Sequence, residues 1–191
     1  MKKASVLPFR LFFLSFICSM LVIACNSGSE EKKDEPSTET KMAEATLSGT
    51  LADTTVSGSL KFSQEGDGKV KMDLELNIPV MANHSVAVHI HEHGDCGDAG
   101  KDAHGHWNPT NKQHGKWGVG EFHLGDIGNI ALDSTGKGTY TLETDLWTIG
   151  GDPNTDIVGK AIIVHAGEDD YTSQPAGNAG PRIGCGVIEK K

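Results

Sequence analysis

The chain has 191 residues, 37% of them hydrophobic, and its formal net charge is −9 at pH 7. This negative charge argues against a nucleic-acid partner, because the phosphate backbone is itself anionic. The length suits one domain with a full hydrophobic core, and the sequence has no visible internal repeat or second domain.

Residues 1–24 are predicted to be an export signal. Lys2, Lys3 and Arg10 are basic, and an apolar run of 14 residues extends from Leu11 to Ala24. This run is too short for a membrane-spanning helix but matches the hydrophobic region of a signal peptide. Removal of these three basic residues with the signal would change the formal charge from −9 to −12.

Cys25 ends the segment Leu21-Val-Ile-Ala-Cys25, which resembles the processing site of bacterial lipoproteins. The resemblance implies that Cys25 is acylated and becomes the mature N-terminus, with a plain secretory signal as the alternative. We therefore expect an exported, lipid-anchored protein of the bacterial cell envelope, on the periplasmic side of a membrane or at the cell surface. Residues 25–43 are polar, with a charged run at 30–35, and are predicted to form an acidic flexible tether.

The next part of the chain is predicted to form β-strands. Apolar and polar residues alternate at 46–51, 56–62 and 70–78, as they do in antiparallel strands with one buried face. The aperiodic stretches 94–128 and 166–183 are longer than ordinary connections, so we expect them to be functional loops.

A strand expected at 85–93 carries two histidines on one face. Its sequence is Ser-Val-Ala-Val-His-Ile-His-Glu-His, and successive side chains of a strand point to opposite faces. His89 and His91 therefore project to one side, and the apolar residues between them take the other. One strand can thus give its apolar side to a core and two nitrogen ligands to a metal.

Further residues of metal-binding type follow at defined intervals. They are His106, His114, His123, Asp126 and His165. His106 stands in a His-Trp-Asn-Pro segment, and His165 ends an apolar run. Together with the His-Ile-His pair, these residues and gaps resemble the copper/zinc superoxide dismutases, with four separate motifs in the same order between about residue 44 and residue 189.

The resemblance implies an all-β fold for residues 44–191, a flattened eight-stranded antiparallel Greek-key barrel with two long functional loops, an architecture to which this family belongs. It implies that copper is bound by His89, His91, His106 and His165. It implies that zinc is bound by His106, His114, His123 and Asp126. The donor types agree, because three imidazoles and one carboxylate make a closed zinc site and four imidazoles suit copper.

The activity implied by the resemblance is the dismutation of the superoxide anion. Copper alternates between two oxidation states, so that one superoxide is oxidised to dioxygen and a second is reduced to hydrogen peroxide with uptake of two protons. A histidine shared by two cations, here His106, must lose both ring protons. When reduced copper releases this ring, His106 can take up a proton and supply it, and solvent supplies the other.

Two further roles are implied by the resemblance. Arg182 places a planar cation beside copper, where it can orient a small anion. Asp169 matches the aspartate that connects a copper ligand to a zinc ligand, here His89 and His114, with the adjacent Asp170 as the alternative.

Cys96 and Cys185 are the two cysteines of the predicted folded domain, and they can pair. Such a bond indicates an oxidising compartment. In the resembling family the corresponding bond ties an active-site loop to the last strand, next to an arginine. Cys96 follows His91 by five residues, a spacing similar to bacterial members, so the eukaryotic dimer interface is not carried over and a homodimer stays open.

Three other histidines, His84, His93 and His104, are predicted to be solvated or core side chains. A single residue separates His104 from His106, so His104 is an alternative bridging ligand. Two rival functions remain, a metal-sequestering lipoprotein of the same fold and an adhesion sandwich that keeps metals for stability. Arg182 favours the enzyme, because a storage site needs no anion-orienting guanidinium. The full set of zinc ligands disfavours a copper-only relative.

Overall fold

The computed structural model describes residues 39–66 and 68–191, which form β-strands and loops with little helix. The predicted export signal, Cys25 and most of the predicted tether lie outside the described residues. In the part of the chain that is described, no helix is both long and apolar enough to cross a membrane.

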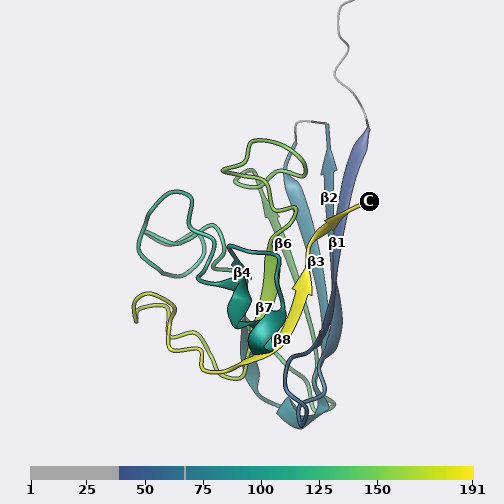
Figure 1. Ribbon diagram of the computed structural model, residues 1–191, viewed down its shortest axis with the longest axis vertical. Coiled ribbons are helices and arrows are strands. Elements are labelled where there is room, and N and C mark those ends of the chain that lie inside the picture. The colour runs from purple at the N-terminus through teal and green to yellow at the C-terminus, as the bar shows by residue number, and fades with distance from the viewer. Residues whose placement is uncertain (1–38, 67) are drawn as a thin grey trace, which may run out of the picture. The chain divides into compact units, whose positions relative to one another are not determined.

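In the described part of the chain, eight strands of four or more residues follow one another (Figure 1). They are β1 (Thr40–Gly49), β2 (Ser57–Glu65), β3 (Val70–Asn77), β4 (Ser85–His91), β5 (Gly128–Ala131), β6 (Lys137–Thr144), β7 (Ala161–His165) and β8 (Arg182–Val187). A two-residue strand, β9 (Glu189–Lys190), pairs with β1. Short helical turns lie in the connections, at η1 (Pro79–Met81), α1 (Gly97–Gly100) and η2 (Lys101–Ala103).

The strands form one antiparallel sheet in the order β5-β4-β7-β8-β1-β2-β3-β6. The first and last strands of this order, β5 and β6, also contact each other, which nearly closes the sheet into a barrel. β3 pairs with β6, and β4 pairs with β7, so the chain crosses the end of the barrel between them. These crossings confirm the predicted all-β, eight-stranded Greek-key architecture.

β1 begins earlier than the sequence pattern indicates. Ala43 is buried and pairs with Phe62 of β2 and with Lys190 of β9. The tether predicted for residues 25–43 is therefore wrong at its C-terminal end, because Thr40 already belongs to the barrel. Pairing with distant strands satisfies the backbone hydrogen bonds of this polar segment, and no local pattern reveals such pairing.

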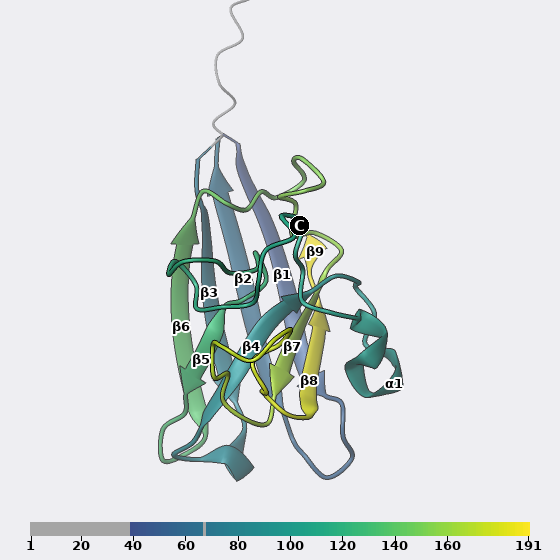
Figure 2. The ribbon, with the colours of Figure 1, turned by 90° about the vertical axis from the view of Figure 1, so that its left-hand side faces the viewer.

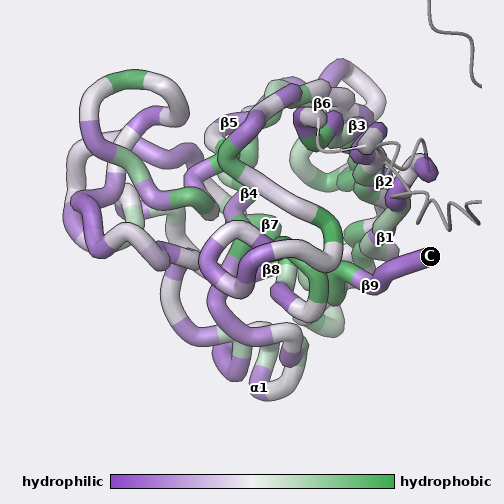
Figure 3. The backbone as a smooth tube through the Cα atoms, turned by 90° about the horizontal axis from the view of Figure 1, so that it is seen from above, coloured by the Kyte–Doolittle hydropathy of each residue, from purple (hydrophilic) through white to green (hydrophobic). Residues whose placement is uncertain are grey.

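Alternate side chains of the strands fill the barrel core. Fully buried members include Leu60, Phe62, Met72, Leu74 and Ile90. Seen from above, hydrophobic segments gather around the strands, and the long loop beside β4 and β5 is largely hydrophilic (Figure 3). The predicted alternation is thus confirmed within β1, β2 and β3, but Leu51, at the end of the first predicted stretch, lies beyond β1 and is exposed.

Strand β4 is buried on both faces. Val86, Val88 and Ile90 point into the core as predicted. His89 and His91 are covered on the other side by two long loops, one between β4 and β5 and one between β7 and β8. These loops lie across the face formed by β4, β5, β7 and β8 (Figure 2). A rigid sheet therefore supplies one wall of the histidine cluster, and loops supply the other.

Candidate metal centre

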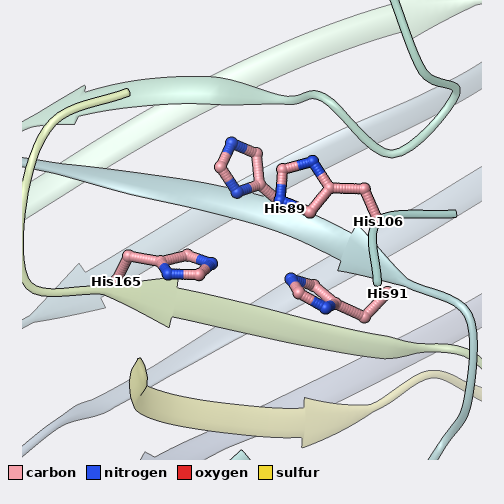
Figure 4. A group of neighbouring side chains, drawn as sticks. All are labelled: His89, His91, His106 and His165. Carbon is pink, nitrogen blue, oxygen red and sulfur yellow. The ribbon is translucent and has the colours of Figure 1, made fainter. Parts of the chain in front are cut away.

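Four histidines meet on the outer face of β4 and β7. His89 and His91 come from β4, His165 ends β7, and His106 comes from the loop that is bridged to β4 at His91. One ring nitrogen from each lies within 4.8 Å of the others, and all four side chains are buried. Figure 4 shows the four rings turned toward a common centre. The structure thus brings together the whole predicted copper set.

The nitrogens that face this centre make no hydrogen bond. They are Nδ1 of His89 and Nε2 of His91, His106 and His165. A buried polar atom without a partner costs free energy, so such atoms are rare in folded proteins. Four unpaired lone pairs aimed at one point fit a bound cation that prefers imidazole nitrogen.

The second nitrogen of three of these rings holds the ring in place. His89 donates from Nε2 to Oδ2 of Asp169 at 2.9 Å. His91 and His165 donate from Nδ1 to the carbonyl oxygens of His104 at 2.9 Å and Gly180 at 3.1 Å. Because the proton sits on the donating nitrogen, the other nitrogen is left as a lone pair.

A second group forms around the carboxylate of Asp126. Nδ1 of His106 lies 2.8 Å from one carboxylate oxygen, Nδ1 of His123 lies 3.3 Å from the same oxygen, and Nδ1 of His114 lies 3.1 Å from the other. All four side chains are buried, and their ligand atoms lie within 4.8 Å of one another. Three imidazoles and one carboxylate at this separation fit a closed tetrahedral zinc site.

His106 belongs to both groups. Its Nδ1 faces Asp126, and its Nε2 faces the four-histidine centre without a hydrogen-bond partner. His104, the alternative bridging residue, is exposed, and its ring packs on His93 with centroids 4.4 Å apart. The alternative in which His104 bridges the two groups is therefore wrong.

Asp169 connects the two groups through the ring nitrogens that face away from them. Its Oδ2 accepts from Nε2 of His89, and its Oδ1 accepts from Nε2 of His114, both at 2.9 Å. The contact predicted for Asp169 is therefore present. Asp170, the alternative, is exposed and its carboxylate is used by nearby loop residues such as Ser173.

Two residues that the sequence analysis did not single out support these contacts. Asn129 of β5 donates from Nδ2 to the carbonyl of Asp169 and accepts the backbone N–H of Asp169 at Oδ1. Gln174 forms the same kind of double contact with the backbone of His114. These pairs are 40 and 60 residues apart in sequence, so no local pattern could have indicated them.

Comparison with known proteins agrees with this geometry. The model of a family described as "Copper/zinc superoxide dismutase (SODC)" matches residues 56–188. A superoxide dismutase [Cu-Zn] of Yarrowia lipolytica is 38% identical over 141 residues, which cover 69% of this chain and 88% of the relative. A superoxide dismutase [Cu-Zn] 2 of the bacterium Aquifex aeolicus is 38% identical over 168 residues, covering 74% and 98%. The chain belongs to the copper/zinc superoxide dismutase family.

The electrostatics of the first group suit a copper/zinc superoxide dismutase. Burial lowers the pKa of His106 to about 4, although the contact with Asp126 opposes this shift. Burial likewise lowers the pKa of His165 to about 3 and holds the pKa of His91 well below its ordinary value. These rings are therefore neutral near pH 7, and neutral imidazole is the form that binds metal.

The two carboxylates are held in their charged form. Burial alone would raise the pKa of Asp126 and of Asp169, but hydrogen bonds from the surrounding histidines lower both well below the usual range. The same contacts outweigh the burial of His114 and raise its pKa to about 9. The zinc group thus combines a fixed anion with rings that this anion orients.

Arg182 lines the same cavity as three of the copper ligands. The cavity has a volume of about 720 Å³, and His91, His106, His165 and Arg182 contribute to its lining. The guanidinium donates from Nη1 and Nη2 to the carbonyl oxygens of Gly100 at 2.5 Å and His104 at 2.6 Å. Two backbone contacts therefore fix the planar cation beside the histidines, as the resemblance implies.

The predicted pairing of Cys96 with Cys185 is confirmed, with a Cα–Cα distance of 5.8 Å. It ties the loop that contains α1 to strand β8, which begins at Arg182. The covalent bond and the two guanidinium contacts therefore act on the same loop. His84 is exposed and belongs to neither metal group.

Proposed function

We propose that this chain catalyses the dismutation of superoxide, in which two superoxide anions and two protons give dioxygen and hydrogen peroxide. Membership of the copper/zinc superoxide dismutase family supports the reaction. The observation that carries the proposal is the ring of His106, which presents one nitrogen to each of two buried ligand groups. A storage protein would need neither this shared ring nor an arginine in the lining of the cavity.

The copper ion would be held by His89, His91, His106 and His165. The zinc ion would be held by His106, His114, His123 and Asp126. When bound, copper supplies the one-electron redox change that the reaction needs, and zinc supplies a fixed structural charge. The six buried ring nitrogens without hydrogen bonds are the atoms that such ions would satisfy.

His106 would hold and deliver a proton at Nε2. His106 contributes to the lining of the cavity, its Nε2 has no hydrogen-bond partner, and its Nδ1 faces Asp126 at 2.8 Å. With Nδ1 committed to zinc, one proton at Nε2 would make the ring a neutral imidazole, the form that burial favours, and the ring could return this proton to a product oxygen. Solvent that enters the cavity supplies the other proton.

Arg182 would bind and orient the anionic substrate. Its guanidinium is fixed by two carbonyl oxygens and keeps other N–H groups for the cavity. A positive charge at this entrance raises the local concentration of small anions, even on a chain with net charge −9. We further propose that the protein is exported and anchored by a lipid on Cys25 in a bacterial cell envelope, where the disulfide fits an oxidising compartment.

The test is a superoxide-decay assay on the purified protein, paired with copper and zinc analysis. Wild type should accelerate the decay in proportion to its copper content. His165→Ala should lose nearly all activity while it remains folded, because it removes one copper ligand at the end of β7. His84→Ala, an exposed histidine outside both groups, serves as the control. Full turnover by His165→Ala at equal copper content would refute the copper assignment.

A further inference from the structure

A third cluster of metal-binding side chains lies outside the buried pair of sites. Glu92, His93 and His104 each offer a ligand atom within 4.8 Å of the others, and all three are exposed. The rings of His93 and His104 pack edge to face, with centroids 4.4 Å apart. Neither the copper group nor the zinc group uses any of these three side chains.

The backbone holds the three residues together without help from a ligand. The N–H of Glu92 donates to the carbonyl of Gly105 at 3.0 Å, and the N–H of His93 donates to the carbonyl of Ala103 at 3.2 Å. The disulfide at Cys96 ties the loop between them to β8, and Arg182 donates to the carbonyl of His104. A cation would therefore bind with little rearrangement of the backbone.

His104 adopts a backbone conformation that side chains other than glycine rarely take. Its φ is 62° and its ψ is −141°, a region that glycine enters without steric cost. Such conformations persist where the surrounding structure imposes them, and they gather at functional sites. Here the conformation places an imidazole beside His93 and turns the carbonyl of His104 toward Arg182.

We propose that Glu92, His93 and His104 form a surface site for a divalent transition-metal ion of the zinc type. Two imidazoles and one carboxylate are a known zinc-binding set, in which solvent or a substrate takes the fourth position. The site differs from the buried centres in its exposure and in having three protein ligands. It is independent of the dismutation proposed above.

The position of this site gives it a consequence for the cavity. Glu92 and His104 line the same cavity as Arg182. The carbonyl of His104 accepts both from Arg182 and from Nδ1 of His91. A cation bound by these three side chains would offset the negative charge of Glu92 in the cavity lining. It would also immobilise His104, whose carbonyl orients the guanidinium.

The test counts zinc on the purified protein after its copper and zinc have been loaded. The protein is equilibrated with free Zn²⁺, separated from unbound ion and analysed for metal, with a calorimetric titration for affinity. Wild type should bind one further Zn²⁺ per chain. His93→Ala, Glu92→Gln and His104→Gly should lose this ion and keep the copper and zinc of the buried centres. His84→Ala, which removes an exposed histidine elsewhere, should keep it.

His104→Gly removes the ring and allows the same backbone conformation, so a fold defect would not imitate the loss of the ion. His93→Ala provides an independent variant on the other side of the pair. Equal zinc content in wild type and His93→Ala would overturn the proposal. This readout does not depend on turnover, so a protein without dismutase activity would still report on the surface site.

Discussion

His106 and Asp169 are the two residues that couple the metal groups, and they do so in different ways. His106 offers a ring nitrogen to each group directly. Asp169 binds the far nitrogens of His89 and His114 and thereby fixes which nitrogen of each ring faces its centre. His106 is thus a shared ligand of both groups, whereas Asp169 acts through the histidine rings that it orients.

Asp169→Asn should weaken zinc binding by about 10- to 100-fold, the usual range for loss of such a partner. The amide has one acceptor oxygen and one donor group, so it cannot accept from both His89 and His114. Competitive zinc titration measures the effect. Asp170→Asn is the matched control, because this neighbouring carboxylate is exposed and contacts only its own loop. Unchanged zinc affinity in Asp169→Asn would remove the positioning role.

Arg182→Ala should leave the copper and zinc contents unchanged and lower the rate of superoxide decay by about tenfold or more, which corresponds to about 1.4 kcal/mol. The guanidinium binds no metal, and its loss removes the cation that orients the anion. Arg182→Lys should lie between the two, because it keeps the charge without the planar fork. Equal decay rates at equal copper content would favour metal sequestration over catalysis.

Among the strands, β4 and β7 pack apolar side chains into the core on one face and carry metal-binding histidines on the other. β4 and β7 are paired neighbours that carry His89, His91 and His165 on the side covered by the loops. The remaining ligands come from the loop between β4 and β5. The strands supply three of the four copper ligands and none of the zinc ligands, so the loop needs separate anchors to supply the rest.

The bond between Cys96 and Cys185 is one of these anchors. It closes a loop with a sequence separation of 89 residues. A double Cys96→Ser and Cys185→Ser variant should lose about 4 to 5 kcal/mol of unfolding free energy in the chain-entropy model. Urea denaturation measures this loss, and wild type under reducing conditions should behave in the same way. A variant with wild-type stability would show that the hydrogen bonds of the loop hold it without the covalent bond.

In the whole molecule, attraction of the substrate and the proposed location in the cell envelope depend on different parts of the chain. The proposed anion site lies on an acidic protein, so attraction of the substrate would depend on the local field of Arg182 and of the bound cations. The proposed location in the cell envelope would depend on Cys25, which lies outside the described residues.

Cys25→Ser should abolish lipid attachment and shift the protein out of the membrane fraction, because its thiol is the acylation point of the predicted lipoprotein signal. Fractionation and mass measurement of the mature N-terminus check this outcome. Superoxide dismutation by the barrel should be unaffected. An unmodified Cys25 in the mature wild-type protein would refute the lipid anchor and leave the proposed activity intact.

The ligand types and the buried faces of the strands could be predicted from the sequence, because both appear as short local patterns. Alternation shows which side of a strand meets the core, and His-Ile-His shows two rings on one side. The intervals from His106 to Asp126 resemble a known family closely enough to predict which residues share a metal. These features depend on short-range geometry and on residue chemistry.

Only the tertiary structure decided the features that join distant segments. Thr40 lies in a strand because β2 pairs with it, although its own neighbours are polar. Asn129 and Gln174 hold Asp169 and His114 through contacts that span 40 and 60 residues. His93 and His104 meet because the loop folds back on β4 under a disulfide. Each of these contacts depends on the path of the chain through space, which composition and periodicity do not specify.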